Sequence, residues 1–258
     1  MRIATWNVNS IRARAERVTA WLARSDVDVL AMQETKCADA DFPYLSFEAY
    51  GYQVAHVGHH QWNGVAIASR VGLDAVETSF PGQPTWGEPP YLEARAIGAT
   101  CAGRRIWSLY VPNGRALDDP HYAYKLTWLH ALNEAASTWP PDATLLAGDW
   151  NVIPTDDDVW DIQALAGKTH VSASERAALA RLAECGFADA TAALRGQYSF
   201  WDYQRLAFAK NRGMRIDLVL GNARLREQVR RCAIDRDERK GAGASDHAPV
   251  VVELAPPT

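Results

Sequence analysis

The segment Gly148-Asp149-Trp150-Asn151 places a carboxylate and a carboxamide two residues apart, directly after the apolar run 143–147. This run predicts a buried strand, and side chains two residues apart at its end point to the same side. An Asp held by an Asn can take a proton from water, and two such oxygens can also lie beside a metal ion. Because a Gly-Asp pair is also common in ordinary turns, the motif needs support from the rest of the chain.

Polar side chains also lie beside or inside four other apolar segments. These segments are Thr5-Trp6-Asn7-Val8-Asn9, Met32-Gln33-Glu34-Thr35-Lys36, Arg215-Ile216-Asp217-Leu218-Val219 and Ser245-Asp246-His247-Ala248-Pro249. Burying such groups beside strands costs free energy unless they are paired or bind an ion. We therefore predict that distant parts of the chain bring these polar groups to one shared site.

Apolar runs and turn residues predict the strands and helices that would carry these groups. The predicted strands are 2–8, 27–32, 53–57, 64–69, 92–100, 105–111, a strand ending at Asp149, 215–220, 231–235 and 248–254. The predicted helices are 11–24, 122–139 and 175–185, the last capped by Ser174. Short turns between consecutive strands, as in 92–111, favour antiparallel pairing. The pattern indicates an α/β domain whose strand pairs are not all βαβ units.

The composition fits a single globular domain over residues 1–258. Of these residues 48% are hydrophobic, and no stretch is long and apolar enough to cross a membrane. The net charge of −4 argues against a protein coated in basic surface, although an acidic pocket with basic rims is allowed. The chain begins on a predicted strand, so we expect no signal or transit peptide. The four cysteines lack metal-type or redox-type spacing, and we expect a cytoplasmic monomer with reduced thiols.

Taken in order, these segments resemble the exonuclease III family of DNA-repair nucleases, which also contains the human-type abasic-site endonucleases. The resemblance runs from Arg2 to Leu254, nearly the whole chain. It includes Asn63-Gly64-Val65-Ala66, Tyr110-Val111-Pro112-Asn113, Ser199-Phe200-Trp201-Asp202-Tyr203 and Asn211-Arg212-Gly213-Met214-Arg215. It implies a four-layer α/β sandwich like deoxyribonuclease I, with two mixed β-sheets face to face, helices outside, and the active site where the sheet edges open.

The shortest motifs are common to a wider superfamily of metal-dependent phosphoesterases that includes inositol phosphatases, sphingomyelinases and deadenylases. The residues shared this widely are Asn7, Glu34, Asp149, Asn151, Asp246 and His247. An enzyme acting on a phosphoinositide, a phospholipid or RNA is therefore the alternative. The fuller segments favour an Mg²⁺-dependent DNA-repair nuclease. Such an enzyme would degrade duplex DNA 3′ to 5′, incise 5′ to abasic sites, and remove 3′-phosphates and other 3′-blocking groups.

Oxygen ligands without thiolates predict a hard cation, Mg²⁺ or Mn²⁺, and Glu34 is the strongest single candidate ligand, with a salt bridge to Lys36 or an arginine as the alternative. The resemblance adds further candidates to the metal site, namely Asn7, Asp149, Asn151, Asp246 and His247.

Among the catalytic candidates, Asp149 would be the general base and Asn151 would position the attacking water. His247 would stabilise the phosphoryl oxygen. By resemblance, Asp217 would fix the tautomer of His247 and raise its pKa. Tyr110 and Asn113 resemble the family's phosphate-facing pair.

Basic side chains are expected to position a DNA duplex through phosphate contacts. The candidates are Arg12, Arg14, Lys36, Lys125, Lys210 and Arg212, with an ordinary charged surface as the alternative for each. Phe200, Trp201 and Met214 are expected to form the wall of a small apolar pocket for a flipped-out baseless sugar. For Trp201, a place in the core is an equal alternative.

Two other clusters of residues could bind a metal ion. His56, His59 and His60 could suggest zinc, but a solvated loop after a strand is the simpler interpretation. Asp156-Asp157-Asp158 could bind a cation, but a solvated acidic loop is the favoured interpretation.

Overall fold

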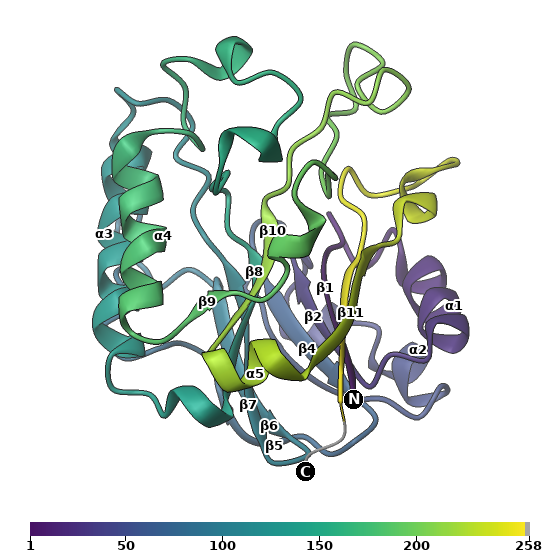
Figure 1. Cartoon of the computed structure of the whole chain (residues 1–258). Helices are drawn as coiled ribbons and strands as arrows, with labels where there is room; N and C mark the ends of the chain where they lie inside the picture. The colour runs from purple at the N-terminus through teal and green to yellow at the C-terminus, as the bar shows by residue number, and fades with distance from the viewer. Residues whose placement is uncertain (256–258) are drawn as a thin grey trace.

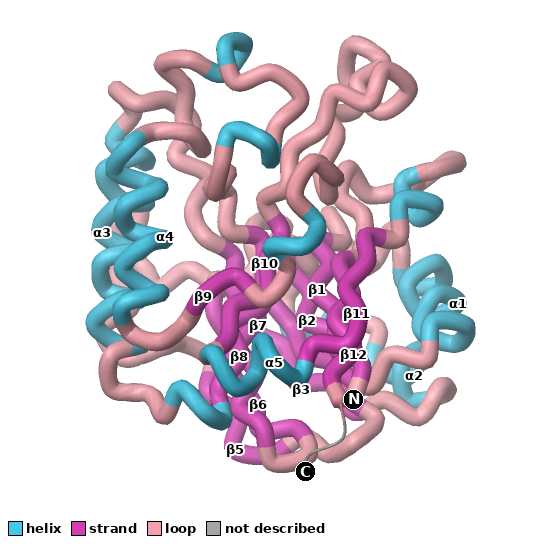
Figure 2. The backbone as a smooth tube through the Cα atoms, viewed as in Figure 1, coloured by secondary structure: helices cyan, strands magenta, loops and turns pink. Residues whose placement is uncertain are grey.

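Two six-stranded mixed β-sheets form the centre of the molecule (Figures 1 and 2). The computed structural model describes residues 1–255, apart from the side chain of Asp142. The first sheet, in the order β11-β12-β1-β2-β4-β3, contains β1 (Arg2–Asn7), β2 (Val29–Gln33), β3 (Gln53–Val57), β4 (Val65–Ser69), β11 (Val229–Ile234) and β12 (Val250–Leu254). The second, in the order β5-β6-β7-β8-β10-β9, contains β5 (Asp74–Glu77), β6 (Ala96–Cys101), β7 (Arg104–Tyr110), β8 (Thr144–Asp149), β9 (Ala188–Asp189) and β10 (Asp217–Gly221).

Helices cover the outer face of each sheet. The α-helices are α1 (Ala15–Ser25) and α2 (Tyr44–Glu48) beside the first sheet, α3 (Pro120–Ala136) and α4 (Ala173–Glu184) beside the second, and α5 (Ala223–Gln228) between β10 and β11. The short 3₁₀ helices are η1 (Asp39–Asp41), η2 (Pro141–Ala143), η3 (Asp156–Asp158), η4 (Gln163–Leu165), η5 (Ala192–Leu194) and η6 (Arg236–Arg239). Separate hydrophobic clusters fill the space between the sheets and the space under each helix pair. The predicted four-layer α/β sandwich is confirmed. Within residues 1–255, no helix has the length and apolar character that crossing a membrane requires.

One parallel pair lies at the centre of each sheet, β1 with β2 and β7 with β8. Strands of a parallel pair end at the same edge of a sheet. Asn7 ends β1 opposite Gln33 at the end of β2, and Tyr110 ends β7 opposite Asp149 at the end of β8. The antiparallel β10 begins at Asp217, also opposite Asp149. The polar residues that close these strands therefore gather at one end of the sandwich.

The first helix begins at Ala15 and not, as predicted, at Ile11. The backbone amides of Ser10 and Ile11 donate to the carbonyl oxygens of Glu34 and Thr35. These bonds draw the chain after β1 against the loop after β2, so the helix starts only beyond them.

The cap of α4 is Ser172 and not the predicted Ser174. The Ser172 Oγ accepts from the Glu175 amide at 3.2 Å, and the Glu175 carboxylate accepts from the Ser172 amide, which forms a capping box. The antiparallel pairing predicted for 92–111 is confirmed in β6 and β7. The edge strand β5 was missed because all of its residues are exposed and no alternation of apolar side chains marks it.

His121, in the first turn of α3, is a buried titratable group. Its Nδ1 accepts from the Gly114 amide at 3.1 Å, and its ring packs edge-on against Trp86 and Tyr124. Burial, together with the nearby charge of Arg95, lowers the pKa of His121 to about 4. The imidazole is therefore neutral in the folded protein at neutral pH.

We predict that His121→Asn will reduce the loss of stability in acid. Between pH 6.5 and about 4, the unfolded chain protonates His121 and the folded chain does not, so the free energy of unfolding falls as pH falls. Asn keeps an acceptor for the Gly114 amide but does not titrate, so the loss across this window should shrink by on the order of 3 kcal/mol. Urea unfolding at several pH values measures this pH dependence of the free energy of unfolding, and His130→Asn, at an exposed histidine, is the control. An unchanged pH dependence would contradict a neutral, buried His121.

Candidate active site

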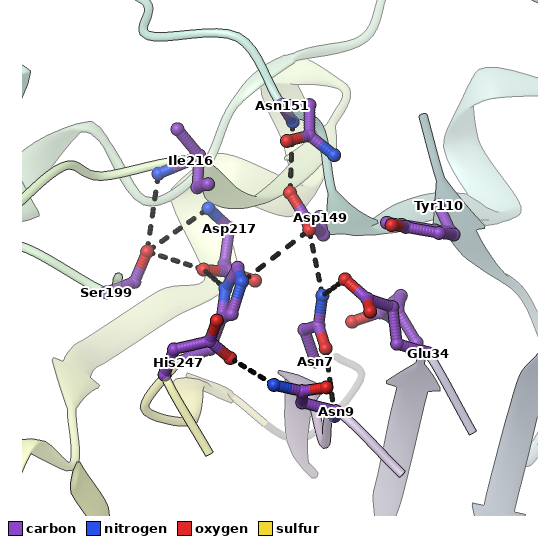
Figure 3. Close-up of polar contacts among 12 residues, drawn as sticks. Asn7, Asn9, Glu34, Tyr110, Asp149, Asn151, Ser199, Ile216, Asp217 and His247 are labelled. Atoms are coloured by element: carbon purple, nitrogen blue, oxygen red, sulfur yellow. Dashed lines mark hydrogen bonds and ion pairs between the residues drawn. The ribbon is translucent and has the colours of Figure 1, made fainter. Parts of the chain in front are cut away.

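Glu34, Asp149 and His247 lie together where the polar strand ends meet (Figure 3). Glu34 follows β2, Asp149 ends β8, and His247 precedes β12. Each offers one ligand atom, and these atoms lie within 4.8 Å of one another. In the part of the chain that the structure describes, no other group of three His, Cys, Asp or Glu side chains comes this close. The fold thus brings together three residues that the sequence assigned to one site.

Asn7 holds the two carboxylates of this group. Its Nδ2 donates to Glu34 Oε1 at 2.7 Å and to Asp149 Oδ2 at 3.0 Å. Its Oδ1 accepts from the backbone amide of Asn9 at 3.0 Å. Asn7 is fully buried, and these bonds satisfy its amide. Asn7 is therefore placed to orient the two acidic side chains, and since its oxygen keeps a second lone pair, its contact with a metal stays a prediction.

Asp217 and Ser199 fix the ring of His247. The ring Nδ1 lies 2.8 Å from Asp217 Oδ2, which also accepts from Ser199 Oγ at 2.6 Å. The other ring nitrogen, Nε2, faces Asp149 Oδ2 at 3.8 Å. The Asp217–His247 contact is the one that the resemblance implied, whereas the part played by Ser199 was not predicted.

The charges around His247 are coupled. Burial by itself would lower the pKa of His247, but Asp217 and Asp149 outweigh burial and raise that pKa. Burial raises the pKa of Asp149, and Asp217 adds to this against the opposing effect of His247. A protonated imidazole has no free lone pair and donates hydrogen bonds, so ligation of a metal by His247 would require loss of this proton.

Lys36 and Tyr110 flank Glu34. Lys36 Nζ lies 2.7 Å from Glu34 Oε2 and donates to Asn9 Oδ1 at 2.6 Å. Burial would raise the pKa of Glu34, but Lys36 and Asn7 outweigh it, and the pKa is lowered. Burial and the Glu34 carboxylate raise the pKa of Tyr110 well above its usual value. The phenol therefore stays protonated and remains a hydrogen-bond donor.

Asn151 belongs to a polar group on the far side of Asp149. Its backbone has a φ of 49°, and its amide donates to Asp149 Oδ1 at 3.0 Å. Its side-chain Oδ1 lies 2.9 Å from His170 Nε2 and 3.2 Å from Asn113 Nδ2. His170 was not predicted, because it lies in an irregular segment with no strand end or motif to mark it. Burial and the charge of Lys125 lower the pKa of His170 to about 3, so its ring is neutral.

Lys125 does not reach the surface, and the prediction that it grips a DNA phosphate is wrong. Its side chain is fully buried, and Nζ lies 2.5 Å from the equally buried Glu175. The same ammonium donates to the carbonyl oxygens of Asn151 at 2.6 Å and Asn113 at 3.2 Å, and to Thr169 Oγ1 at 3.4 Å. Lys125 therefore ties together the loops that carry the two site amides.

A cleft of about 290 Å³ lies beside His247. Its lining includes Trp160, Phe200, Arg212 and Met214. The Phe200 ring centroid lies 4.9 Å from that of His247, which joins the cleft to the acidic group. The Arg212 guanidinium stacks over Trp160 at 4.7 Å. Three of the predicted substrate-binding residues thus share one cleft.

Trp201 does not line this cleft. It is 1% exposed and packs with Ala207 and Ala248 in a hydrophobic cluster. The prediction that Trp201 forms a pocket wall is therefore wrong, and the alternative place in the core is correct. Neighbouring residues of an extended segment point to opposite sides, so Phe200 and Trp201 could not both face the cleft.

Other predicted residues lie outside the close group of Glu34, Asp149 and His247. Asp246 Oδ1 accepts from Asn9 Nδ2 at 3.0 Å, and Asp246 stays outside the close group of ligand atoms. Arg14 donates to the backbone carbonyl of Asn9 and so braces this loop. Arg12 and Lys210 are exposed, and their phosphate contacts stay predictions.

The structure also tests the interpretations of the histidine cluster and of the acidic segment 156–158. Asp158 is fully buried in a salt bridge with Arg215 at 2.7 Å, so the interpretation as a solvated loop is wrong for this residue. His59 and His60 are exposed, whereas His56 is buried, which contradicts the solvated interpretation for His56.

The donor set fits a hard divalent cation. Glu34 and Asp149 bring two carboxylates close together in a largely buried place, and although Lys36 and a protonated His247 face them, the third carboxylate, that of Asp217, leaves the group with an excess of negative charge. Oxygen donors without thiolates suit Mg²⁺ or Mn²⁺. Glu34 and Asp149 are therefore the residues that would hold the ion.

A model of the endonuclease/exonuclease/phosphatase family matches residues 4–247. The chain belongs to this family. Within it, the chain is a member of the exonuclease III and AP endonuclease group, and it is a hydrolase of the nuclease class. The family resemblance found in the sequence is confirmed.

Three relatives show how close the likeness is. Exodeoxyribonuclease III from Haemophilus influenzae is 27% identical, over 98% of this chain and 100% of its own length. The 3′ phosphatase NExo from Neisseria, solved with a product DNA hairpin, is 32% identical with a TM-score of 0.92 over 99% of both chains. An AP endonuclease from Archaeoglobus fulgidus is 34% identical with a TM-score of 0.91, over 98% of this chain and 99% of its own.

We predict that Lys125→Met will be strongly destabilised. Removing the ammonium leaves Glu175 buried without its counter-charge, a change that typically costs about 3–5 kcal/mol. Lys168→Met, at an exposed lysine of the same region, is the matched control. The double variant Lys125→Met/Glu175→Gln should recover part of the loss, because no buried charge is left unpaired. Urea unfolding compares the variants, and equal stabilities of the two single variants would show that Lys125 is no brace.

Proposed function

We propose that this chain is a DNA-repair nuclease of the exonuclease III type that depends on Mg²⁺ or Mn²⁺. Its activities would be 3′ to 5′ degradation of duplex DNA, incision 5′ to abasic sites, and removal of 3′-phosphates and other 3′-blocking groups. The observation that carries the proposal is the meeting of Glu34, Asp149 and His247 within 4.8 Å, on a fold shared with such enzymes. We expect the enzyme to act inside the cell as a monomer on double-stranded DNA.

A single reaction would serve all three activities. In each, water attacks phosphorus, the bond between phosphorus and the 3′ oxygen breaks, and a 3′-hydroxyl is left. The other product is a 5′-mononucleotide, a strand that begins with a deoxyribose 5-phosphate, or inorganic phosphate. The cleft lined by Phe200, Arg212 and Met214 would receive the other sugar, the one joined to the phosphorus through its 5′ oxygen. A terminal 3′-phosphate carries no such sugar and would leave the cleft empty.

The catalytic work would divide among the side chains at the strand ends. Asp149 would accept a proton from the attacking water, since a raised pKa suits a carboxylate to this role. Asn151 would position that water. His247, held in its charged form by Asp217, would donate to a phosphoryl oxygen, and the protonated phenol of Tyr110 would act beside it. A divalent ion bound by Glu34 and Asp149 would neutralise charge that develops on the phosphate.

The relatives favour DNA as the substrate. The Neisseria enzyme was solved with a product DNA hairpin and is described as a 3′ phosphatase, and the Archaeoglobus enzyme is an AP endonuclease. Both are similar to this chain along nearly its whole length, which supports DNA over a lipid or an inositol phosphate. The two descriptions name different activities, so the three activities of this chain are to be ranked by comparing its rates on the three DNA substrates.

We predict that labelled duplexes with a 3′-phosphate, an abasic site or an intact recessed 3′ end will be hydrolysed with Mg²⁺ and not with EDTA. Asp149→Asn should lower kcat by roughly 100-fold or more, because it removes the general base. Glu34→Gln should raise the Mg²⁺ concentration needed for half-maximal rate. The exposed Glu48→Gln serves as the matched control. Turnover of a phosphoinositide or a phospholipid, with none on the three duplexes, would favour the alternative phosphoesterase.

A further inference from the structure

The loop that presents Glu34 has an unusual backbone conformation. Glu34 and Lys36 both have a φ of 51°, in the left-handed region that side chains other than glycine seldom adopt. Such conformations persist only where the surroundings fix them. Thr35, between these two residues, is fully buried and is the natural place for that fixation.

The backbone around Thr35 is held on two sides. The amides of Thr35 and Lys36 donate to the carbonyl oxygens of Gly64 at 3.1 Å and Asn63 at 2.9 Å. On the other side, the Thr35 carbonyl oxygen accepts from the Ile11 amide at 2.9 Å. A Cβ at Gly64 would lie 2.1 Å from Thr35 Oγ1, so a glycine is required where the threonine hydroxyl is seated.

The Thr35 hydroxyl meets a buried histidine. Thr35 Oγ1 lies 2.7 Å from His56 Nε2, and the His56 ring packs against Phe42 with centroids 4.6 Å apart. On the opposite side of the ring, Nδ1 lies 2.8 Å from Asp39 Oδ1, a close contact that lacks the geometry of a hydrogen bond. That carboxylate oxygen also accepts from the Gly58 amide at 2.8 Å. A line of polar groups thus runs from the exposed Asp39, through His56, to Thr35.

The direction of the hydrogen bond follows from the charges. Burial lowers the pKa of His56 to about 4 although Asp39 opposes this, so the ring is neutral at neutral pH. A neutral ring carries one N–H, and the Asp39 carboxylate favours it at Nδ1. Nε2 is then an acceptor, and the Thr35 hydroxyl donates to it.

A nucleophilic role for the neighbouring thiol is excluded by its burial. Cys37 Sγ lies 4.0 Å from His56 Nε2, so Cys37, His56 and Asp39 have the order of a nucleophile, a base and an acid. The thiol is 1% exposed, and burial raises its pKa to about 11. It is neither ionised nor reachable, so His56 does not activate it as a nucleophile.

We propose that Asp39, His56 and Thr35 form a positioning relay that fixes the Glu34 backbone and thereby sets the affinity of the site for a divalent cation. This inference rests on the metal-dependent function proposed above. The relay residues touch neither substrate nor ion. They act by removing the freedom of the loop to relax, so that the Glu34 carboxylate stays beside Asp149 without a further cost when a cation binds.

The test compares substitutions of Thr35 that remove its hydroxyl with one that keeps it. Thr35→Val keeps the branched shape and loses the donor, whereas Thr35→Ser keeps the donor. Isothermal titration with Mn²⁺, without DNA, should show a dissociation constant raised roughly tenfold in Thr35→Val, the usual scale for losing support of a ligand. Thr35→Ser should stay close to the parent. His56→Phe, which preserves the packing against Phe42, should match Thr35→Val, and the double variant should be no weaker than either single variant.

Thermal unfolding separates positioning from packing. If Thr35→Val and His56→Phe lower Tm but bind Mn²⁺ like the parent, the relay has only a packing role and the inference is overturned. Asp39→Asn, at a largely exposed position, provides a variant that leaves the core intact and should weaken Mn²⁺ binding to a smaller extent. Failure of the parent itself to bind Mn²⁺ would overturn both the relay and the proposed function, whereas unchanged binding in the variants would overturn the relay alone.

Discussion

The burial of like charges at one end of the sandwich is the constraint on which the rest of the site depends. Glu34, Asp149 and Asp217 come from both sheets, and such carboxylates cannot all stay ionised in a buried place without compensation. His247 lies between Asp217 and Asp149, and Lys36 lies beside Glu34. Lys36 and a protonated His247 do not balance these three carboxylates, and a divalent cation bound by Glu34 and Asp149 would compensate the remaining negative charge.

The sheets bring these groups to one edge, but loops set their final positions. The loops after β2 and β8 contain Glu34 and Asn151, both with positive φ, so their backbones need support from outside the loop. Lys125, on α3, supports the loops after β7 and β8 through its ammonium. His56, on β3, contacts the loop after β2. Each half of the site therefore has a buried polar support that lies away from the chemistry.

The strand end at Asp149 was predicted from the sequence, and the predicted strands 2–8 and 27–32 end one residue from the observed ends at Asn7 and Gln33, because buried apolar runs carry their own signal. The layer arrangement came from the family resemblance and not from periodicity. Loop residues were harder, because their partners are distant in sequence. Lys125 was assigned to phosphate contact as one of several basic side chains, yet it pairs with Glu175, which lies 50 residues further on. Nothing local marks His170, which meets Asn151 only in the folded chain.

The short segment 199–201 shows why cleft and catalytic centre cannot be varied independently. Its backbone pairs with the segment that carries His247, through Trp201 N to Asp246 O at 2.9 Å and Ala248 N to Ser199 O at 2.7 Å. Its side chains then go separate ways: Ser199 binds Asp217, Phe200 lies against the His247 ring, and Trp201 enters the core. A change in the cleft wall at Phe200 therefore acts on the same backbone that orients the imidazole. Selection for a different sugar in the cleft would have to preserve this pairing, in which Met214 also takes part through two backbone hydrogen bonds with Phe200 at 3.0 Å.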